Sequence, residues 1–254
     1  MSHFVLVHGI SHGAWCWYKL IPLLKEAGHQ VTALDLGECG GHAGLRGEIE
    51  TLDDHVKPLM DLMRSIDDDK KVIIVGHSFG GIAISLAMEK FPDKISVAIY
   101  VSAYMPNWSS PPITLLLETF RRTHLEEFLD TKFVYDNGLD NIATRDLELA
   151  KMLVKLDGLF GDDLAKESLF TEERFGRVKR VFVTCEEDEL TKIDFQEWII
   201  NTSPPHQVKS IPKADHMAML STPHQLLNCL KEIIAQIFQP TKTGILLISP
   251  MISA

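Results

Sequence analysis

The segment Gly76-His77-Ser78-Phe79-Gly80 carries a residue type that can do covalent chemistry. A serine with a glycine two positions away on either side is typical of a sharp turn that joins a strand to a helix and exposes the hydroxyl. Glycines are needed there because a side chain would collide with neighbouring backbone. Alone, the pattern also fits an ordinary glycine-rich turn. The apolar run 72–75 before it and the apolar helical run 81–88 after it favour a nucleophilic Ser78.

A serine hydroxyl becomes a good nucleophile only when a base removes its proton, and histidine is the usual base. Among the eleven histidines, His216 is favoured because it follows the short strand 207–211 and precedes the closing helix 223–238. A loop in that position lies at the carboxyl ends of the strands, where Ser78 is also expected. The other candidates are expected at the opposite sheet edge, in a helix start, at the surface or at the first strand: His206, His224, His29 with His55, and His3.

The carboxylate that orients this histidine is expected after the strand 178–184, where four acidic residues follow in Glu186-Glu187-Asp188-Glu189. Asp188 is far enough past the strand to reach a neighbouring loop, and it gives the chain order serine, acid, histidine. Glu187 is the main rival. Asp215 directly precedes His216 and is badly placed to orient that ring, so we interpret it as a loop cap or a solvated charge.

Acyl transfer places negative charge on the former carbonyl oxygen, and hydrogen-bond donors fixed in advance stabilise that charge. Backbone N–H groups can supply them. One is expected from Phe79, next to the nucleophile and at a helix N-terminus, and the other from the loop 8–13, with Ile10 as the candidate. A glycine-rich turn without a donor role is the alternative interpretation of that loop.

Strands and helices alternate along the first hundred residues, and this alternation would position the chemical groups. Apolar strands are predicted at 4–7, 30–35, 71–75 and 95–102, with helices at 17–27, 51–66 and 80–91. Strands that are apolar throughout are buried on both faces, and strands that alternate with helices indicate parallel pairing. The fold class is therefore α/β, with a doubly wound, mostly parallel sheet.

A long interval separates the strand 95–102 from the next strand, 178–184. A plain crossover needs only about 10 to 20 residues. Helical patterns near 112–128 and 146–154 indicate that the surplus is an inserted cap, about 104–177. The alternation then resumes with a helix at 194–202, so we predict one domain over 1–238 and a tail, 239–254, that is disordered or loosely docked.

Charge and composition limit the partners. The 254 residues include 25 Lys and Arg against 35 Asp and Glu, and the net charge of −10 argues against nucleic acid or an anionic membrane as a partner. No apolar run approaches the roughly 20 residues of a membrane span, and no secretory signal is recognisable. Four separated cysteines without a CxxC pair are interpreted as reduced thiols. A cytosolic location and a small-molecule partner are expected.

From residue 3 to about 238 the chain resembles the plant methylesterases of the α/β-hydrolase superfamily. Six motifs carry the resemblance: FVLVHG at 4–9, HGAW at 12–15, GHSFGG at 76–81, SAYMP at 102–106, DLELA at 146–150 and ADHMAML at 214–220. The match is closest to esterases of monoterpene indole alkaloid pathways. It implies an α/β-hydrolase fold with an inserted helical cap and no metal or cofactor. It also implies a triad of Ser78, Asp188 and His216, with an oxyanion hole formed by Ile10 and Phe79.

Hydroxynitrile lyases share this scaffold, and the resemblance identifies them by a threonine at the position of Gly9 and a lysine at that of Met217. A hydroxyl and an ammonium suit a cyanohydrin and its departing cyanide, whereas Gly9 and Met217 leave an apolar pocket suited to an ester. The residues expected to bind substrate are Gly9, His77, Tyr104, Met105, Leu159, Phe160 and Met217.

One departure from the family concerns the cap. Between 141 and 144 the chain lacks a stretch that family members normally have, whose aromatic side chains help to wall the acyl site. The expected function is a serine carboxylesterase that cleaves a methyl ester of a hydrophobic plant metabolite, a hormone or alkaloid ester, through an acyl-enzyme. A lyase or decarboxylating synthase, a ligand receptor that keeps the triad, and a catalytically idle relative stay as alternatives. A homodimer is compatible with each.

Overall fold

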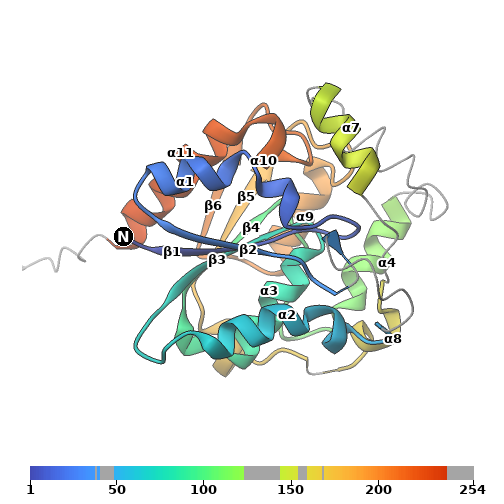
Figure 1. Ribbon diagram of the computed structural model, residues 1–254. Coiled ribbons are helices and arrows are strands. Elements are labelled where there is room, and N and C mark those ends of the chain that lie inside the picture. Colours follow the sequence, from blue (N-terminus) through green and yellow to red (C-terminus); the bar gives the residue numbers. More distant parts are fainter. Residues whose placement is uncertain (38, 41–48, 123–143, 154–158, 168, 239–254) are drawn as a thin grey trace, which may run out of the picture.

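A sheet of parallel strands forms the centre of the molecule (Figure 1). The computed structural model describes residues 1–37, 39–40, 49–122, 144–153, 159–167 and 169–238. Over these residues the strand order is β2-β1-β3-β4-β5-β6, and each neighbouring pair is parallel. The strands are β1 (His3–Val7), β2 (Gln30–Leu34), β3 (Val72–His77), β4 (Ile95–Val101), β5 (Arg180–Cys185) and β6 (Gln207–Ile211). The predicted fold class is confirmed.

The position of a strand in the sheet decides how well it is buried. The inner strands β1, β3, β4 and β5 are almost completely buried, as their mostly apolar sequences indicate. The edge strand β2 departs from that expectation, because its residues are only partly buried or exposed. The other edge strand, β6, alternates between exposed and less exposed residues. An edge strand has a neighbour on one side only and lies where the covering helices end.

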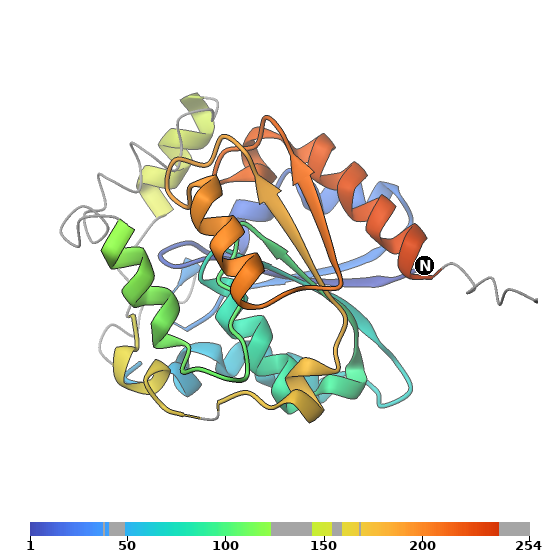
Figure 2. The ribbon, with the colours of Figure 1, turned by 180° about the vertical axis from the view of Figure 1, so that it is seen from behind.

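Helices cover both faces of the sheet, so alternate strand residues enter two separate cores. Along β1, Phe4 and Leu6 pack into one core, and Val5 and Val7 into the other. The first core receives α1 (Leu20–Glu26) and α11 (Pro223–Ile237), and the second receives α2 (Leu52–Ser65), α3 (Gly80–Lys90) and α9 (Ile193–Thr202). Figures 1 and 2 show these two layers from opposite sides. Short helical turns complete them: η1 (Ala14–Trp17), η3 (Pro92–Lys94) and α10 (Ala218–Ser221).

The amphipathic helix α2 overturns one prediction. Its N-terminus is capped by Thr51, whose Oγ1 accepts a hydrogen bond from Asp54 N–H at 3.2 Å. His55 was predicted at the surface, and that prediction was wrong, because only 1% of it is exposed. The helical repeat places His55 on the buried face of α2, where its Nδ1 lies 3.1 Å from the carbonyl oxygen of Gly37.

The helices of the cap region between β4 and β5 lie beside the carboxyl ends of the strands, but its last turn, Glu172–Gly176, packs against the C-terminal end of α3, where Arg174 donates to the carbonyl oxygen of Lys90. Figure 1 shows its helices at the end of the molecule away from the N-terminus. The described segments are α4 (Ile113–Arg122), α7 (Thr144–Leu153), α8 (Gly161–Leu164) and the π-helical turn η4 (Glu172–Gly176). The buried Asp146 of α7 holds this region to the core, because its carboxylate accepts hydrogen bonds from Tyr18 Oη and Lys19 Nζ. The family difference at 141–143 and the tail 239–254 lie outside the described residues.

No helix in the described part of the chain is both long enough and apolar enough to cross a membrane.

Candidate active site

Five loops at the carboxyl ends of the strands bring together residues that are far apart in the sequence. Parallel strands all end at the same edge of a sheet, so the segments that follow β1, β3, β4, β5 and β6 meet there. These segments contain, in that order, Ile10, Ser78, Ser102, Asp188 and His216. The topology therefore places every residue of the predicted triad and oxyanion hole at one edge.

Ser78 occupies the sharp turn between β3 and α3. Its backbone has φ of 50°, in the left-handed region that non-glycine residues rarely adopt, and 5% of the residue is exposed. The turn is possible only because two glycines follow. A Cβ at Gly80 would lie 2.3 Å from the carbonyl oxygen of His8, and a Cβ at Gly81 would lie 2.2 Å from that of Tyr104. The strained turn is thus fixed by close backbone packing on both sides.

His216 and Asp188 form a buried pair. His216 Nδ1 donates to Asp188 Oδ2 at 2.8 Å, and each residue is 3% exposed. The second carboxylate oxygen, Oδ1, accepts backbone N–H bonds from Leu190 at 2.9 Å and Thr191 at 2.7 Å. Because Nδ1 carries the proton, the lone pair of the neutral ring lies on Nε2. Within the described residues Ser78 Oγ makes no hydrogen bond to that nitrogen, and such contacts often tighten only when substrate binds.

Ser102 is a site residue that sequence reasoning missed. Its Oγ donates to Asp188 Oδ2 at 2.5 Å, so this carboxylate oxygen accepts from both Ser102 and His216. The backbone φ of Ser102 is 41°, so Ser102 has a positive φ at this edge of the sheet, as Ser78 and Ser11 do. The available signal was its position directly after β4, the strand between the one that carries Ser78 and the one that carries Asp188. Ser102 fixes the carboxylate that in turn fixes His216.

His77, the neighbour of Ser78, holds the backbone of the histidine loop. Its Nε2–H donates to the carbonyl oxygen of His216 at 2.7 Å, and the two rings have centroids 4.6 Å apart. Burial lowers the pKa of His77 well below its usual range, and the nearby His216 lowers it further. The ring of His77 is therefore neutral, and it holds the loop of His216 without adding a positive charge there.

The backbone N–H groups of Ile10 and Phe79 are both available as donors. Neither donates to another atom among the described residues. The carbonyl oxygen of Ser78, which belongs to the same peptide unit as Phe79 N–H, accepts from Gly81 N–H and from Tyr104 N–H, each at 3.0 Å. Both amides can therefore donate to a bound group, as the stabilisation of a developing oxyanion requires.

The rival acidic residues and histidines lie elsewhere. Glu187 is exposed, whereas Asp188 is buried against His216. Asp215 acts as a loop cap, since its Oδ1 accepts from Met217 N–H at 2.9 Å and from Ser221 Oγ at 2.7 Å. His206 directly precedes β6, and its Nδ1 lies 3.2 Å from the backbone nitrogen of Arg180, the first residue of β5, so it is at the amino ends of the strands. His224 is exposed in the first turn of α11.

Six of the residues expected to bind substrate are two that contact the turn of Ser78 and Phe79, namely Gly9 and Tyr104, and four packed apolar side chains. Gly9 lies directly beside Ser78, because a Cβ on Gly9 would be 2.8 Å from Ser78 Cβ. Tyr104 contacts Phe79 edge-on, with ring centroids 6.1 Å apart, and its hydroxyl bonds to Thr119 Oγ1 at 2.9 Å. The other members are packed side chains: Met105 and Met217 are buried, and Leu159 and Phe160 are partly buried.

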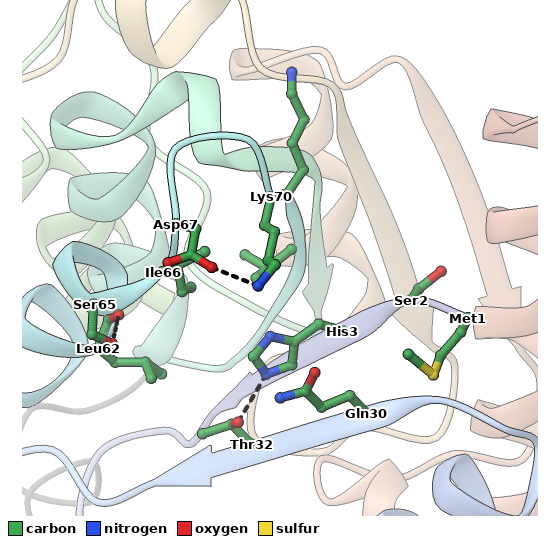
Figure 3. Close-up of a pocket in the computed structure, with 12 residues that line it drawn as sticks. Met1, Ser2, His3, Gln30, Thr32, Leu62, Ser65, Ile66, Asp67 and Lys70 are labelled. Carbon is green, nitrogen blue, oxygen red and sulfur yellow. Dashed lines mark hydrogen bonds and ion pairs between the residues drawn. The ribbon is translucent and has the colours of Figure 1, made fainter.

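A separate pocket lies at the other end of the strands. It has a volume of about 560 Å³ and is lined by residues that include Met1, His3 and Lys70 (Figure 3). Its polar side chains bind one another: His3 Nε2 lies 2.8 Å from Thr32 Oγ1, and Lys70 Nζ is 2.5 Å from Asp67 Oδ2. This pocket is far from Ser78, since it surrounds the amino ends of β1 and β3.

Among the residues that the structure describes, no group of three His, Cys, Asp or Glu side chains is arranged to hold a metal ion.

The buried histidines of the loop after β1 predict a fold that weakens in acid. Burial lowers the pKa of His8 and of His12 from 6.5 to about 4. The unfolded chain binds these protons near pH 6.5 and the folded protein only near pH 4, so stability is full above pH 6.5 and is lost as the pH falls. At pH 5 the free energy of unfolding is expected to be lower by about 2 kcal/mol for each histidine.

Urea unfolding at pH 8, 6 and 5 measures this effect. The control is His12→Gln, which removes one of the two groups, so its free energy of unfolding is expected to depend less on pH between 6.5 and 4.5. A wild-type free energy that stays constant over that interval would contradict the prediction.

The chain is similar to known proteins over most of its length. The model of the alpha/beta hydrolase family matches residues 4–228. Methylesterase 10 of Arabidopsis thaliana is 43% identical over 93% of this chain and 93% of its own, and norfluorocurarine synthase 1 of Strychnos nux-vomica is 40% identical over 91% and 95%. The crystal structure of polyneuridine aldehyde esterase has a TM-score of 0.89 at 41% identity, covering 92% of this chain and 99% of that chain. The chain therefore belongs to the alpha/beta hydrolase family, in the group that contains the plant methylesterases.

Proposed function

We propose that the protein is a serine carboxylesterase that hydrolyses the methyl ester of a small hydrophobic plant metabolite through an acyl-enzyme. One arrangement carries the proposal: Ser78 is held at φ of 50° beside a buried histidine–carboxylate pair whose Nδ1–Oδ2 distance is 2.8 Å. The names of two similar proteins, Methylesterase 10 and polyneuridine aldehyde esterase, support an ester as the substrate class.

The first half-reaction forms the acyl-enzyme. His216 Nε2 takes the proton of Ser78 as Oγ attacks the ester carbonyl carbon, and the carbonyl oxygen becomes an oxyanion between the N–H groups of Ile10 and Phe79. The imidazolium is stabilised by Asp188, which Ser102 and two backbone amides hold in place. His216 then returns its proton to the departing methoxide, and methanol leaves.

The second half-reaction releases the acid. A water molecule gives a proton to His216 Nε2 and attacks the acyl carbon, and a second oxyanion forms at the same two amides. Collapse of this intermediate breaks the bond to Ser78 Oγ, which recovers its proton from His216. One methanol and one carboxylic acid are formed for each ester and water consumed.

The surroundings of Ser78 favour an uncharged ester over a cyanohydrin. Gly9 brings no hydroxyl next to Ser78, and Met217 brings no ammonium beside His216. Tyr104 stays neutral, because burial raises the pKa of its hydroxyl, and it packs edge-on against Phe79 and Phe195 with ring centroids 6.1 Å away in each case. A hydrophobic acyl group suits such a site.

A second candidate adds one step to the same chemistry. If the acyl part is a β-oxo acid, the free acid formed by hydrolysis can lose carbon dioxide and leave a ketone or aldehyde. A similar solved structure, a variant of tomato methylketone synthase I that is 37% identical with a TM-score of 0.84, is complexed with beta-ketoheptanoate, a β-oxo acid, and this supports the extension. Release of carbon dioxide in a fixed ratio to methanol distinguishes it from simple hydrolysis.

A panel of methyl esters tests the proposal: methyl salicylate, methyl jasmonate, methyl indole-acetate and an alkaloid β-oxo methyl ester. Methanol and acid are measured together, and at least one ester is expected to give them in equal amounts over many turnovers. A serine-directed phosphonate is expected to add its mass to the tryptic peptide 72–90, on Ser78 and not on Ser85.

Two results would reject hydrolysis. Binding of an ester with no more than one turnover would indicate a receptor, and release of an aldehyde from a cyanohydrin without methanol release from any ester would indicate a lyase. Phosphonate labelling that is absent from Ser78 would reject the acyl-enzyme.

A further inference from the structure

His8 is a buried histidine that the proposed reaction does not use. It follows β1 directly, none of it is exposed, and both of its ring nitrogens are engaged. Nε2 lies 2.9 Å from the backbone nitrogen of Leu36, and Nδ1 lies 2.7 Å from the carbonyl oxygen of Gly9. The Leu36 N–H can only donate, so Nε2 is the acceptor, Nδ1 carries the hydrogen, and Nδ1–H donates to Gly9.

The Gly9 carbonyl belongs to the same peptide unit as the N–H of Ile10. A trans peptide is planar, so its C=O and N–H groups point in opposite directions, and holding the oxygen fixes the direction of the N–H. A hydrogen bond to the oxygen also polarises the unit and makes its N–H a stronger donor. His8 therefore acts on the one group of Ile10 that is expected to meet the oxyanion.

The two donor peptides are held by different means. The Ser78–Phe79 unit is held through the Ser78 carbonyl by two backbone amides, each at 3.0 Å. The Gly9–Ile10 unit is held by the His8 side chain at 2.7 Å and by a longer bond from His12 N–H at 3.4 Å. Substitution of a single side chain can thus disturb the second donor and leave the first intact.

We propose that His8 is a positioning residue, which orients and polarises the Gly9–Ile10 peptide so that Ile10 N–H binds the oxyanion of the reacting ester. This inference rests on the proposed esterase function. His8 does not touch the substrate, because it is fully buried and both nitrogens are bonded to backbone atoms. Its partner Leu36 lies just after the edge strand β2, so the ring links the loop of the candidate site to that strand.

Two amide substitutions separate the two hydrogen bonds. The nitrogen of an asparagine side chain reaches about as far as His Nδ1, so His8→Asn keeps a donor for Gly9 and loses the acceptor for Leu36. The oxygen of a glutamine reaches about as far as His Nε2, so His8→Gln keeps the acceptor for Leu36 and loses the donor for Gly9. Both variants replace a neutral ring with a neutral amide.

The expected result is a difference between these variants in catalysis. His8→Gln is expected to lower kcat for the best methyl ester by about 10-fold to 100-fold, with KM little changed, as for a weakened oxyanion donor. Its affinity for a trifluoromethyl ketone, which forms a tetrahedral oxyanion on Ser78, is expected to fall by a similar factor, while affinity for the product acid is kept. His8→Asn is expected to retain most of kcat.

Three outcomes overturn the inference. The first is wild-type kcat and ketone affinity in His8→Gln. The second is a loss of kcat that is equal in both variants and parallels a loss in their free energy of unfolding in urea. The third needs no variant: nitrogen NMR of the wild-type protein that finds the His8 hydrogen on Nε2. Failure of the esterase function itself is seen separately, as wild-type protein that releases no methanol or as Ser78→Ala that still does.

Discussion

Replacing Ser78 with alanine is expected to lower kcat for methyl ester hydrolysis by about a million-fold. The substitution removes the oxygen that forms the acyl bond, and no other described hydroxyl occupies the turn after β3. The amide donors and the binding site stay in place, so residual rate enhancement of about a thousand-fold over water is expected. Alanine has the same Cβ as serine, and the φ of 50° therefore costs about as much in the variant as in the wild type.

Ser85→Ala is the matched control. Ser85 lies in α3, buried, where its Oγ donates to the Gly81 carbonyl at 2.6 Å and lies 2.8 Å from Tyr100 Oη. Its loss is expected to reduce the free energy of unfolding by about 1 kcal/mol and to leave kcat within about twofold. Methanol release, measured on both variants, tests whether Ser78 is the nucleophile. Turnover by Ser78→Ala at a hundredth of the wild-type rate or faster would exclude Ser78 as the nucleophile.

The second large effect is expected at Asp188, where asparagine should lower kcat by about ten thousand-fold. The asparagine oxygen can still accept from Leu190 and Thr191 N–H, so the loop is expected to keep its shape. The amide nitrogen then faces His216 and can only donate. His216 must present Nδ1 as an acceptor, its hydrogen moves to Nε2, and the ring can no longer take the proton of Ser78.

Glu187→Gln is the control for Asp188→Asn. It also removes one carboxylate from the same loop, but Glu187 is exposed, whereas the Asp188 carboxylate is buried and accepts from His216 Nδ1. Its kcat is expected to stay within about twofold. The pH dependence of kcat is measured alongside, since a rate for Asp188→Asn that recovers at high pH fits the tautomer argument. Equal activity of Asp188→Asn and wild type would show that another group orients His216.

The alternation of strands and helices can be predicted from the hydrophobic pattern, because a strand that is buried on both faces needs apolar residues at nearly every position. The runs that become β1, β3 and β4 are mostly apolar and lack the alternation of polar residues that would give an exposed face, and they are largely buried in the structure. The prediction at β2 was less accurate, because burial at an edge depends on where the neighbouring helices end. His55 shows the same limit, since a single polar residue on an amphipathic helix does not reveal which face it occupies.

The hydrogen bonds within the candidate site are harder to predict from the sequence than the strand ends at which its residues lie. Ser102 and His8 each form one short hydrogen bond, to Asp188 and to the Gly9 carbonyl, and no spacing in the sequence marks these pairs. Such bonds depend on angles and on distances of a few tenths of an ångström. Pattern can place a residue at the edge of the sheet, but it cannot tell which atom its side chain faces.

The sequence by itself determined the kind of chemistry and the layers that support it, because a serine flanked by glycines between an apolar strand and an apolar helix has few other uses, and alternating apolar segments have few ways to pack. Only the tertiary structure decided that Ser102 also holds the Asp188 carboxylate, and which nitrogens of His8 and His77 carry the hydrogen. These outcomes depend on loops from five strands that converge at one edge, where the whole sheet places partners that are far apart in the chain, such as Ser102 and Asp188 or His77 and His216.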